Sequence, residues 1–211
     1  MDHSNAFQAA LQKFVSLGDN CELGMVQRHF GHEESGLLRW AGTPPDSLIK
    51  GLTTRFSELY AFENIVPIFD GIITDAGTGI SFHSDIRSEV IEGKREFIKK
   101  GEALKISYLE EFEKICYQKE KLLTQLQSGE KIFVYKHNGN RMQADQLEAL
   151  RKAILTFNAR NLLLVLKEAA DPLKIGVVET VAERLILGHI DYFAHYDAVD
   201  RASFQVWKKY S

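Results

Sequence analysis

Two side chains capable of covalent chemistry, Cys21 and His83, stand far apart in the chain. Cys21 lies in the stretch FVSLGDNCELG, between a short apolar run and a segment with a helical pattern. A thiol in the first turn of a helix meets free backbone N–H groups and the positive end of the helix dipole, which favour the nucleophilic thiolate. A thiol enzyme also needs an imidazole that accepts the proton. Because His83 ends the apolar segment GISFH, it is the candidate base for a Cys21 nucleophile.

Asn20 precedes the thiol directly and carries a side-chain amide. Together with the backbone amide of Cys21, it can donate hydrogen bonds to the oxyanion that forms during acyl transfer. The alternative interpretation is structural, because cysteines at turns often serve as small buried hydrophobes. Spacing by itself leaves both interpretations open.

Other combinations of polar residues are less complete. The turn LGDN resembles the Gly-Asp-Ser block of the flat-sheet lipases and esterases, but Asn20 stands in the place of the serine and no Asp-x-x-His partner follows near the C-terminus. The pairs His29 with His32 and His189 with Asp191 offer fewer than the three protein ligands that a catalytic zinc usually needs. We therefore expect neither serine hydrolysis nor a metal site. His137, in the segment HNGN after a predicted strand, is a candidate ligand-binding residue because ligands gather at the carboxyl ends of parallel strands.

Length and composition favour one globular domain, over residues 1–211, with a soft internal boundary near residue 85. The formal charge of −3 and the mixing of acidic with basic residues disfavour a nucleic-acid or anionic-membrane surface. The two cysteines are too few for a disulfide framework, and the start MDHSNAFQAA lacks a secretory pattern, so we expect a cytoplasmic protein. The longest apolar run, residues 162–166, is too short to span a membrane. The oligomeric state is left open.

Hydrophobic periodicity predicts an α/β fold with a layered, mostly parallel sheet, flanking helices and an inserted β-hairpin. Buried strands are expected at 14–17, 131–137, 161–168 and 174–179. The runs 131–137 and 161–168 should be adjacent and parallel, because both are apolar and a helix-length segment joins them. Strand-like runs at 65–69, 71–74 and 79–83 indicate the hairpin. Helices are expected at 5–12, 21–30, 44–56, 88–127, 143–157 and near the C-terminus from 197.

Three further residues are expected near the candidate site. We expect Trp40 to pack near the helix that follows Cys21. Arg39, inside the apolar segment LLRWA, should reach a carboxylate or line the cleft, because a buried guanidinium needs a partner. A purely structural ion pair is the alternative. Asp85 is the acid nearest to His83, two residues farther along the chain.

Several of these segments resemble one known family. The segments are SLGDNCELGMVQRHFG, GLLRWAGTPPDSL, GISFHSD and FEKICYQKEKLL, followed by the strand KIFVYKH. Their combination resembles the bacterial domain-of-unknown-function family described as papain-like cysteine peptidases, over residues 12–138. The resemblance implies Cys21 as the nucleophile and His83 as its base. Asn20, Arg39 and Trp40 match positions of the same motifs.

Two functions follow as competing hypotheses. The first is a thiol-dependent hydrolase or acyl-transfer enzyme that uses a Cys/His dyad, needs no metal or organic cofactor, and acts on a small-molecule, peptide or glycan-related substrate. The second is a non-peptidase α/β domain that binds a sugar, a nucleotide-sugar or a glycan-related partner through loops at strand ends; an inactive scaffold is a third possibility. A hydrogen bond between the Cys21 sulfur and the His83 ring would favour the first hypothesis.

Overall fold

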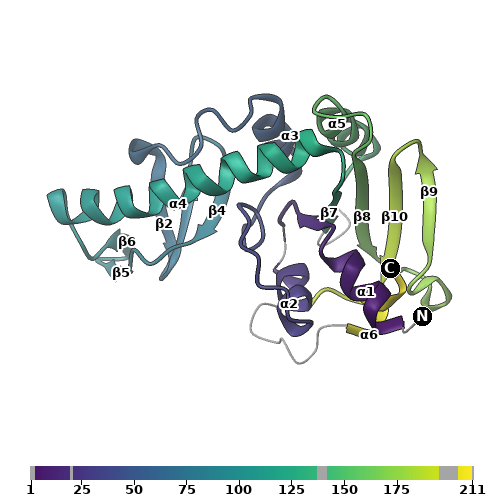
Figure 1. Cartoon of the computed structure of the whole chain (residues 1–211). Helices are drawn as coiled ribbons and strands as arrows, with labels where there is room; N and C mark the ends of the chain where they lie inside the picture. Colours follow the sequence, from purple (N-terminus) through teal and green to yellow (C-terminus); the bar gives the residue numbers. More distant parts are fainter. Residues whose placement is uncertain (1–2, 20, 137–141, 195–203, 211) are drawn as a thin grey trace.

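The computed structural model describes residues 3–19, 21–136, 142–194 and 204–210. Its main sheet, sheet A, has the strand order β1-β7-β8-β10-β9 (Figure 1). The strands are β1 (Phe14–Ser16), β7 (Ile132–Lys136), β8 (Leu162–Glu168), β9 (Val178–Ala182) and β10 (Leu185–Ile190). β1, β7, β8 and β10 run parallel, and β9 pairs antiparallel with β10. The predicted α/β class with a mostly parallel sheet is therefore confirmed.

The predicted pairing of β7 with β8 is also confirmed. The two strands are parallel neighbours, in a register that runs from Ile132 opposite Leu162 to Lys136 opposite Leu166. The crossover between them contains α5 (Ala144–Leu155), whose first turn is closed by a capping box between Gln143 and Gln146. The near-continuous apolar sequence of both strands fits this position, because both faces of a parallel sheet are covered.

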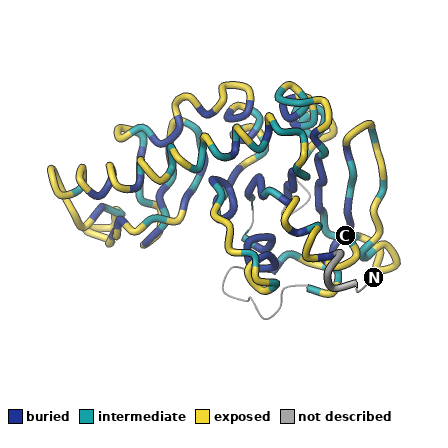
Figure 2. The backbone as a smooth tube through the Cα atoms, in the orientation of Figure 1, coloured by how far each residue is buried: buried dark blue, intermediate teal, exposed yellow. Residues whose placement is uncertain are grey.

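Alternating side chains of sheet A enter two separate hydrophobic clusters. Along β7, Phe133 and Tyr135 belong to one cluster and Val134 to the other. The cluster with Val134 includes residues of α1 (His3–Leu11), α2 (Glu22–His29) and α6 (Phe204–Trp207), which precedes the short η5 (Lys208–Tyr210). The cluster with Phe133 includes residues of α3 (Pro45–Thr53), α4 (Gly101–Ser128) and α5. Figure 2 shows the resulting run of buried residues through the central strands.

The chain between α3 and α4 forms two small antiparallel sheets. Sheet B has the order β2-β3-β4, and sheet C pairs β5 with β6. Their bounds are η1 (Phe62–Asn64), β2 (Ile65–Phe69), β3 (Ile72–Asp75), β4 (Ile80–His83), β5 (Ser88–Ile91) and β6 (Lys94–Phe97). The reversal from β3 to β4 is held by Asp75, whose carboxylate accepts hydrogen bonds from Gly77 N (3.0 Å) and Thr78 Oγ1 (2.8 Å).

α4 connects these small sheets with sheet A. Figure 1 shows this long helix running from sheets B and C to the main sheet. Near one end, the Glu111 carboxylate accepts hydrogen bonds from the Tyr60 hydroxyl (2.6 Å) and the Asp85 amide (2.6 Å). Near the other end, Leu122 and Leu126 join the hydrophobic cluster that also contains residues of sheet A. One continuous core therefore fixes the antiparallel strands relative to the parallel ones.

Some sequence predictions were wrong. Residues 88–97 were predicted to be helical but form β5 and β6, which reverse through Glu92 (φ 50°) and Gly93 (φ 79°). Positive φ at both central residues is the hairpin geometry that glycine favours, and the high charge of this segment concealed it. The strand predicted at 174–179 begins later, since η3 (Pro172–Lys174) precedes β9. β10 was missed, and most of the predicted C-terminal helix lies outside the described residues.

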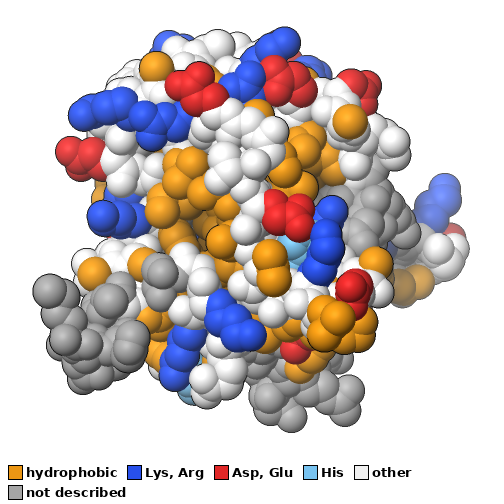
Figure 3. Space-filling model, turned by 90° about the vertical axis from the view of Figure 1, so that its right-hand side faces the viewer, with side chains coloured by type: hydrophobic (Ala, Val, Ile, Leu, Met, Phe, Trp, Pro, Cys, Tyr) orange, Lys and Arg blue, Asp and Glu red, His pale blue; other side chains and the backbone are white. Residues whose placement is uncertain are grey.

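The edge of sheet A at β9 is partly apolar on its outer side. Val178 and Val181 are 49% and 46% exposed. Figure 3, which views this side of the molecule, shows hydrophobic side chains gathered near the centre of the face, with acidic and basic side chains around them. Among the described helices, none combines the length and apolar character that crossing a membrane requires.

Candidate functional site

The turn between β1 and α2 has an unusual backbone. Gly18 has φ 93°, and the next residue, Asp19, has φ 69°, which is uncommon for a residue with a side chain. A Cβ at Gly18 would lie 2.1 Å from Thr43 Oγ1, so only glycine fits. The Gly18 amide donates to Ser16 Oγ (3.3 Å). Strained backbone of this kind is maintained when its surroundings hold it, and it occurs often at functional sites.

Cys21 stands directly after this turn, at the N-cap position of α2. Its backbone is already helical (φ −77°, ψ −7°), and its carbonyl accepts the Met25 amide (3.1 Å). The half-buried thiol makes no capping hydrogen bond, so the side chain is not used to close the helix. The expected placement of Cys21 at a strand-to-helix turn is therefore found, with Cys21 one residue before the first residue of α2.

A buried lysine approaches this turn from the neighbouring strand. Lys136 ends β7, and its side chain is fully buried (0% exposed). Since Ser16 at the end of β1 is in register with Val134, Lys136 lies just beyond the paired residues, at the level of the turn. Burial lowers the pKa of Lys136 to about 8, against the opposing attraction of Glu22, Cys21 and Asp19.

Burial and a nearby charge shift the pKa of the Cys21 thiol in opposite directions. Burial is the larger effect and raises the pKa of Cys21 above its ordinary value, and the positive charge of Lys136 offsets part of this rise. Burial likewise raises the pKa of Glu22, although Trp207 Nε1 and the Ala194 amide each donate a hydrogen bond of 2.6 Å to its carboxylate. The cation that acts on the pKa of Cys21 is therefore Lys136. Through its two hydrogen bonds, Glu22 connects the start of α2 to the C-terminal part of the chain.

His83 lies in a different place. It is exposed at the end of β4 and lines a cleft of about 750 Å³ between sheet B and α4. Asp85 lines the same cleft, with its carboxylate 3.9 Å from the Lys114 ammonium. Cys21 does not line it, and among the described residues no hydrogen bond connects Cys21 with His83. The structure thus places His83 and Asp85 in one cleft, and the charge that acts on the pKa of Cys21 is that of Lys136.

Arg39 and Trp40 support α2. The ring of Trp40 packs on Gly24, where an added Cβ would lie 2.8 Å from it, which confirms the predicted contact with the Cys21 helix. Arg39 is 4% exposed, and its guanidinium donates to the carbonyls of Gly24 (3.0 Å) and His32 (2.8 Å). It also donates to the Glu34 carbonyl. The hydrogen bonds of Arg39 therefore go to backbone carbonyls and not to the expected carboxylate.

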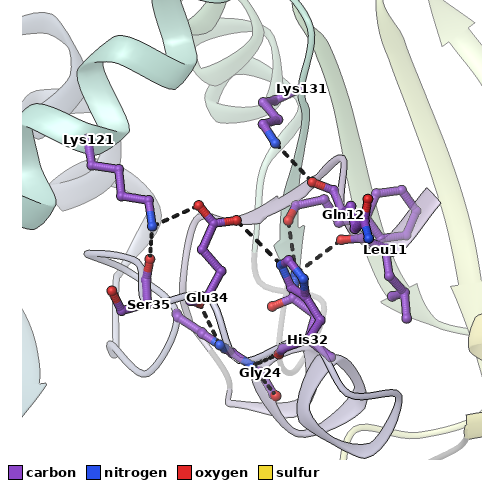
Figure 4. Close-up of polar contacts among 11 residues, drawn as sticks. Leu11, Gln12, Gly24, His32, Glu34, Ser35, Lys121 and Lys131 are labelled. Carbon is purple, nitrogen blue, oxygen red and sulfur yellow. Dashed lines mark hydrogen bonds and ion pairs between the residues drawn. The ribbon is translucent and has the colours of Figure 1, made fainter. Parts of the chain in front are cut away.

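The same network reaches α4. Lys121 forms an ion pair with Glu34 (2.8 Å) and donates to the Ser35 carbonyl (2.7 Å), as drawn in Figure 4. On the other side of α2, Gln27 Nε2 donates to the Phe14 carbonyl (2.9 Å) at the start of β1. These contacts hold α2, and with it Cys21, against the start of β1 and against α4.

Two residues of the predicted site, Asn20 and His137, lie outside the described residues, so their roles stay predictions. Sequence reasoning did not include Lys136 and Glu22. A charged residue that ends an apolar strand, as in IFVYK, was the available signal for Lys136. In the described part of the chain, no three His, Cys, Asp or Glu side chains are grouped so that they could hold a metal ion.

Comparisons with models of protein families, with curated proteins and with solved structures find no match to this chain. The function is therefore argued from its own residues.

Replacing Gly18 with Ala tests the constraint on the turn. Gly93→Ala is the matched control, because Gly93 also has positive φ (79°) but an added Cβ meets nothing within 4 Å. We expect Gly93→Ala to cost about 1 kcal/mol from backbone strain. Gly18→Ala should cost about 2 kcal/mol more, because Thr43 must also move. Urea unfolding measures both losses, and equal losses would contradict a turn held by Thr43.

Replacing Lys136 with Met tests its low pKa. Because the folded protein releases this proton near pH 8 and a free lysine near 10.5, the unfolded chain binds more protons between these values. Stability therefore rises with pH in this window. We expect the wild type to gain up to about 3 kcal/mol relative to Lys136→Met as the pH increases from 8 to 10.5. Urea unfolding of both proteins across the window measures the gain, and parallel curves would contradict it.

Proposed function

We propose that the protein is a thiol-dependent hydrolase or acyl-transfer enzyme in which Cys21 is the nucleophile and Lys136, not His83, is its charged neighbour. The observation that carries this proposal is the fully buried Lys136 near the start of α2, whose charge offsets part of the rise in the pKa of Cys21 that burial causes. The resemblance to papain-like cysteine peptidases supports the same nucleophile. The strained turn at Gly18 and Asp19 supports it further, because the thiol is held where the backbone N–H groups of a helix begin.

The chemistry assigns one role to each group. The Cys21 thiolate attacks the carbonyl carbon of an ester, thioester or amide, and the carbonyl oxygen gains the negative charge. Backbone N–H groups in the first turn of α2 donate to this oxyanion. Collapse of the intermediate expels the leaving group and forms an acyl thioester on Cys21. Lys136 favours the thiolate while charged and, with a pKa of about 8, can exchange a proton near neutral pH.

In this proposal the enzyme works in the cytoplasm as one layered α/β domain with its β-hairpin inserted before α4. The reducing conditions of the cytoplasm keep a catalytic thiol free. The reaction needs no metal or organic cofactor, and the substrate is a small-molecule, peptide or glycan-related acyl compound. Attack on such a substrate leaves an acyl group on Cys21, which is directly measurable.

p-Nitrophenyl acetate is a suitable probe for the proposed acylation. We expect a burst of p-nitrophenolate and an acetyl group on Cys21, located by peptide mass mapping, with little on Cys116. Cys21→Ala should abolish the burst. Lys136→Met should slow it by about tenfold, because each unit by which the thiol pKa rises removes tenfold of the thiolate.

His83→Ala separates the two possible partners of the thiol. Because His83 lines a cleft that does not include Cys21, we expect the burst rate of this variant to equal that of the wild type. Circular dichroism establishes that each variant is folded. A burst that depends on His83 and not on Lys136 would restore the Cys/His dyad, and a burst that persists in Cys21→Ala would refute the thiol mechanism.

A second candidate function, binding of a sugar or glycan-related ligand without thiol chemistry, is favoured by the cleft at His83. This cleft of about 750 Å³ offers the exposed aromatic ring of Phe69 together with polar side chains such as His83 and Gln118. Sugars commonly place an apolar ring face on an aromatic side chain while their hydroxyl groups bind polar groups. His83 and Asp85 would then be binding residues.

NMR titration with glucose, galactose and N-acetylglucosamine tests this candidate. We expect saturable shifts of residues that line the cleft, including His83, and their loss in Phe69→Ala. Since Phe69 is 63% exposed, the variant should fold normally. Val90→Ala, which removes another exposed side chain from the small sheets (60%), is the control and should bind like the wild type. Absence of shifts with all three sugars would contradict binding of these sugars.

A further inference from the structure

A second cleft, of about 430 Å³, opens at the carboxyl ends of β8 and β10. It is on the side of sheet A that α5 covers, because Met142, which lines it, packs against the same hydrophobic cluster as α5. Among its other lining residues are Lys167 near the end of β8 and His189 near the end of β10. The carboxyl ends of parallel strands are where open α/β sheets bind ligands.

His189 is a buried polar side chain without a hydrogen-bond partner. It is 3% exposed, and neither ring nitrogen has such a partner among the described residues. Its closest carboxylate oxygen, Glu179 Oε2, lies 3.6 Å from Nε2, which is beyond hydrogen-bond distance. The backbone of His189 is fixed, because its amide donates to Val177 O and its carbonyl accepts from Tyr210 Oη. An imidazole that is held in place and left unsatisfied at a cleft wall is an available donor.

Lys167 stands beside this imidazole. The two residues are directly in register on neighbouring parallel strands, so their side chains leave the sheet on the same face. Lys167 is half-buried and, within the described part of the chain, forms no ion pair or hydrogen bond. An ammonium group in this position is a cation without a counterion.

The acidic residues of the cleft are already engaged. Glu179, next to the cleft, forms an ion pair with Lys174 (3.0 Å). Asp171 Oδ1 accepts the Leu173 amide (2.9 Å) where it caps η3. Glu168 Oε1 accepts the Phe193 amide (3.3 Å). Lys167 is thus the charged residue of the cleft wall that has no ion pair or hydrogen bond in the described part of the chain.

The N-terminus of α5 adds positive potential. Met142, in the cleft wall, is two residues before the first residue of this 12-residue helix. The backbone N–H groups at a helix start attract anions. Lysine and histidine therefore present donors to one small space near the start of α5.

From these observations we propose that the cleft binds an oxyanion, the phosphate or carboxylate group of a small molecule, between Lys167 and His189. The Lys167 ammonium supplies the charge and the His189 ring N–H the directional hydrogen bond. The proposed oxyanion site is independent of Cys21, because the side chain of Lys136, the cation near Cys21, lies on the opposite face of sheet A.

NMR titration of the full-length protein with inorganic phosphate, and in parallel with sodium acetate, tests the proposal. The ring signals of His189 are assigned by their loss in His189→Asn. We expect them to shift saturably with at least one of the two anions. A shift with phosphate alone assigns a phosphate group, and a shift with acetate alone or with both includes a carboxylate. No shift of His189 with either anion would overturn the proposal.

Lys167→Met is the decisive variant. Loss of a charge-assisted hydrogen bond should weaken the binding of the active anion by about tenfold. Lys105→Met is the matched control, because Lys105 on α4 is exposed and also forms no ion pair or hydrogen bond in the described chain; its affinity should equal that of the wild type. Wild-type affinity in Lys167→Met, or equal weakening in both variants, would overturn the assignment to Lys167. If Lys167→Met does not fold, Lys167→Gln replaces it.

Discussion

The electrostatic interaction of two buried charges, Glu22 at the start of α2 and Lys136 at the end of β7, is the constraint on which the candidate site depends. Each side chain is fully buried, and each acts on the pKa of the other. Glu22 also accepts hydrogen bonds from Trp207 and Ala194, so the C-terminal part of the chain is held to the same point. Removing one charge from such a pair leaves the other buried without compensation, which is far more costly than a lost surface ion pair.

This constraint also defines the surroundings of the Cys21 thiol. The residue follows a turn that only glycine at position 18 allows, and it precedes a carboxylate that cannot move. Its environment therefore combines a desolvated sulfur, a nearby cation and the start of a helix. The cleft at Lys167 and His189 also lies at the carboxyl ends of the sheet A strands, but on the other face. Polar side chains near these strand ends line it, at the position where open α/β sheets bind ligands. The antiparallel sheets carry a separate cleft at His83.

Secondary structure followed from the sequence wherever one pattern was unambiguous. The apolar runs of β7 and β8 predicted their burial, their parallel pairing and the helix between them, because few other arrangements cover two such strands. The charged segment 88–97 misled the prediction. β5 and β6 form a largely exposed ribbon, so their sequence is as polar as that of a solvent-exposed helix. For Arg39, burial predicted a partner correctly, but the carbonyls of Gly24 and His32 took the place of a carboxylate.

The sequence by itself determined that Cys21 stands between a strand and a helix, because that placement depends on neighbouring residues and on the glycine before it. It also determined the parallel pairing of β7 with β8. Only the tertiary structure decided which side chain acts on the pKa of the Cys21 thiol. His83 and Lys136 are both distant from Cys21 in the chain, and the order of strands in sheet A, with β7 beside β1, selects the lysine. The pairing of Lys167 with His189 likewise arises from strand register, which no local pattern contains.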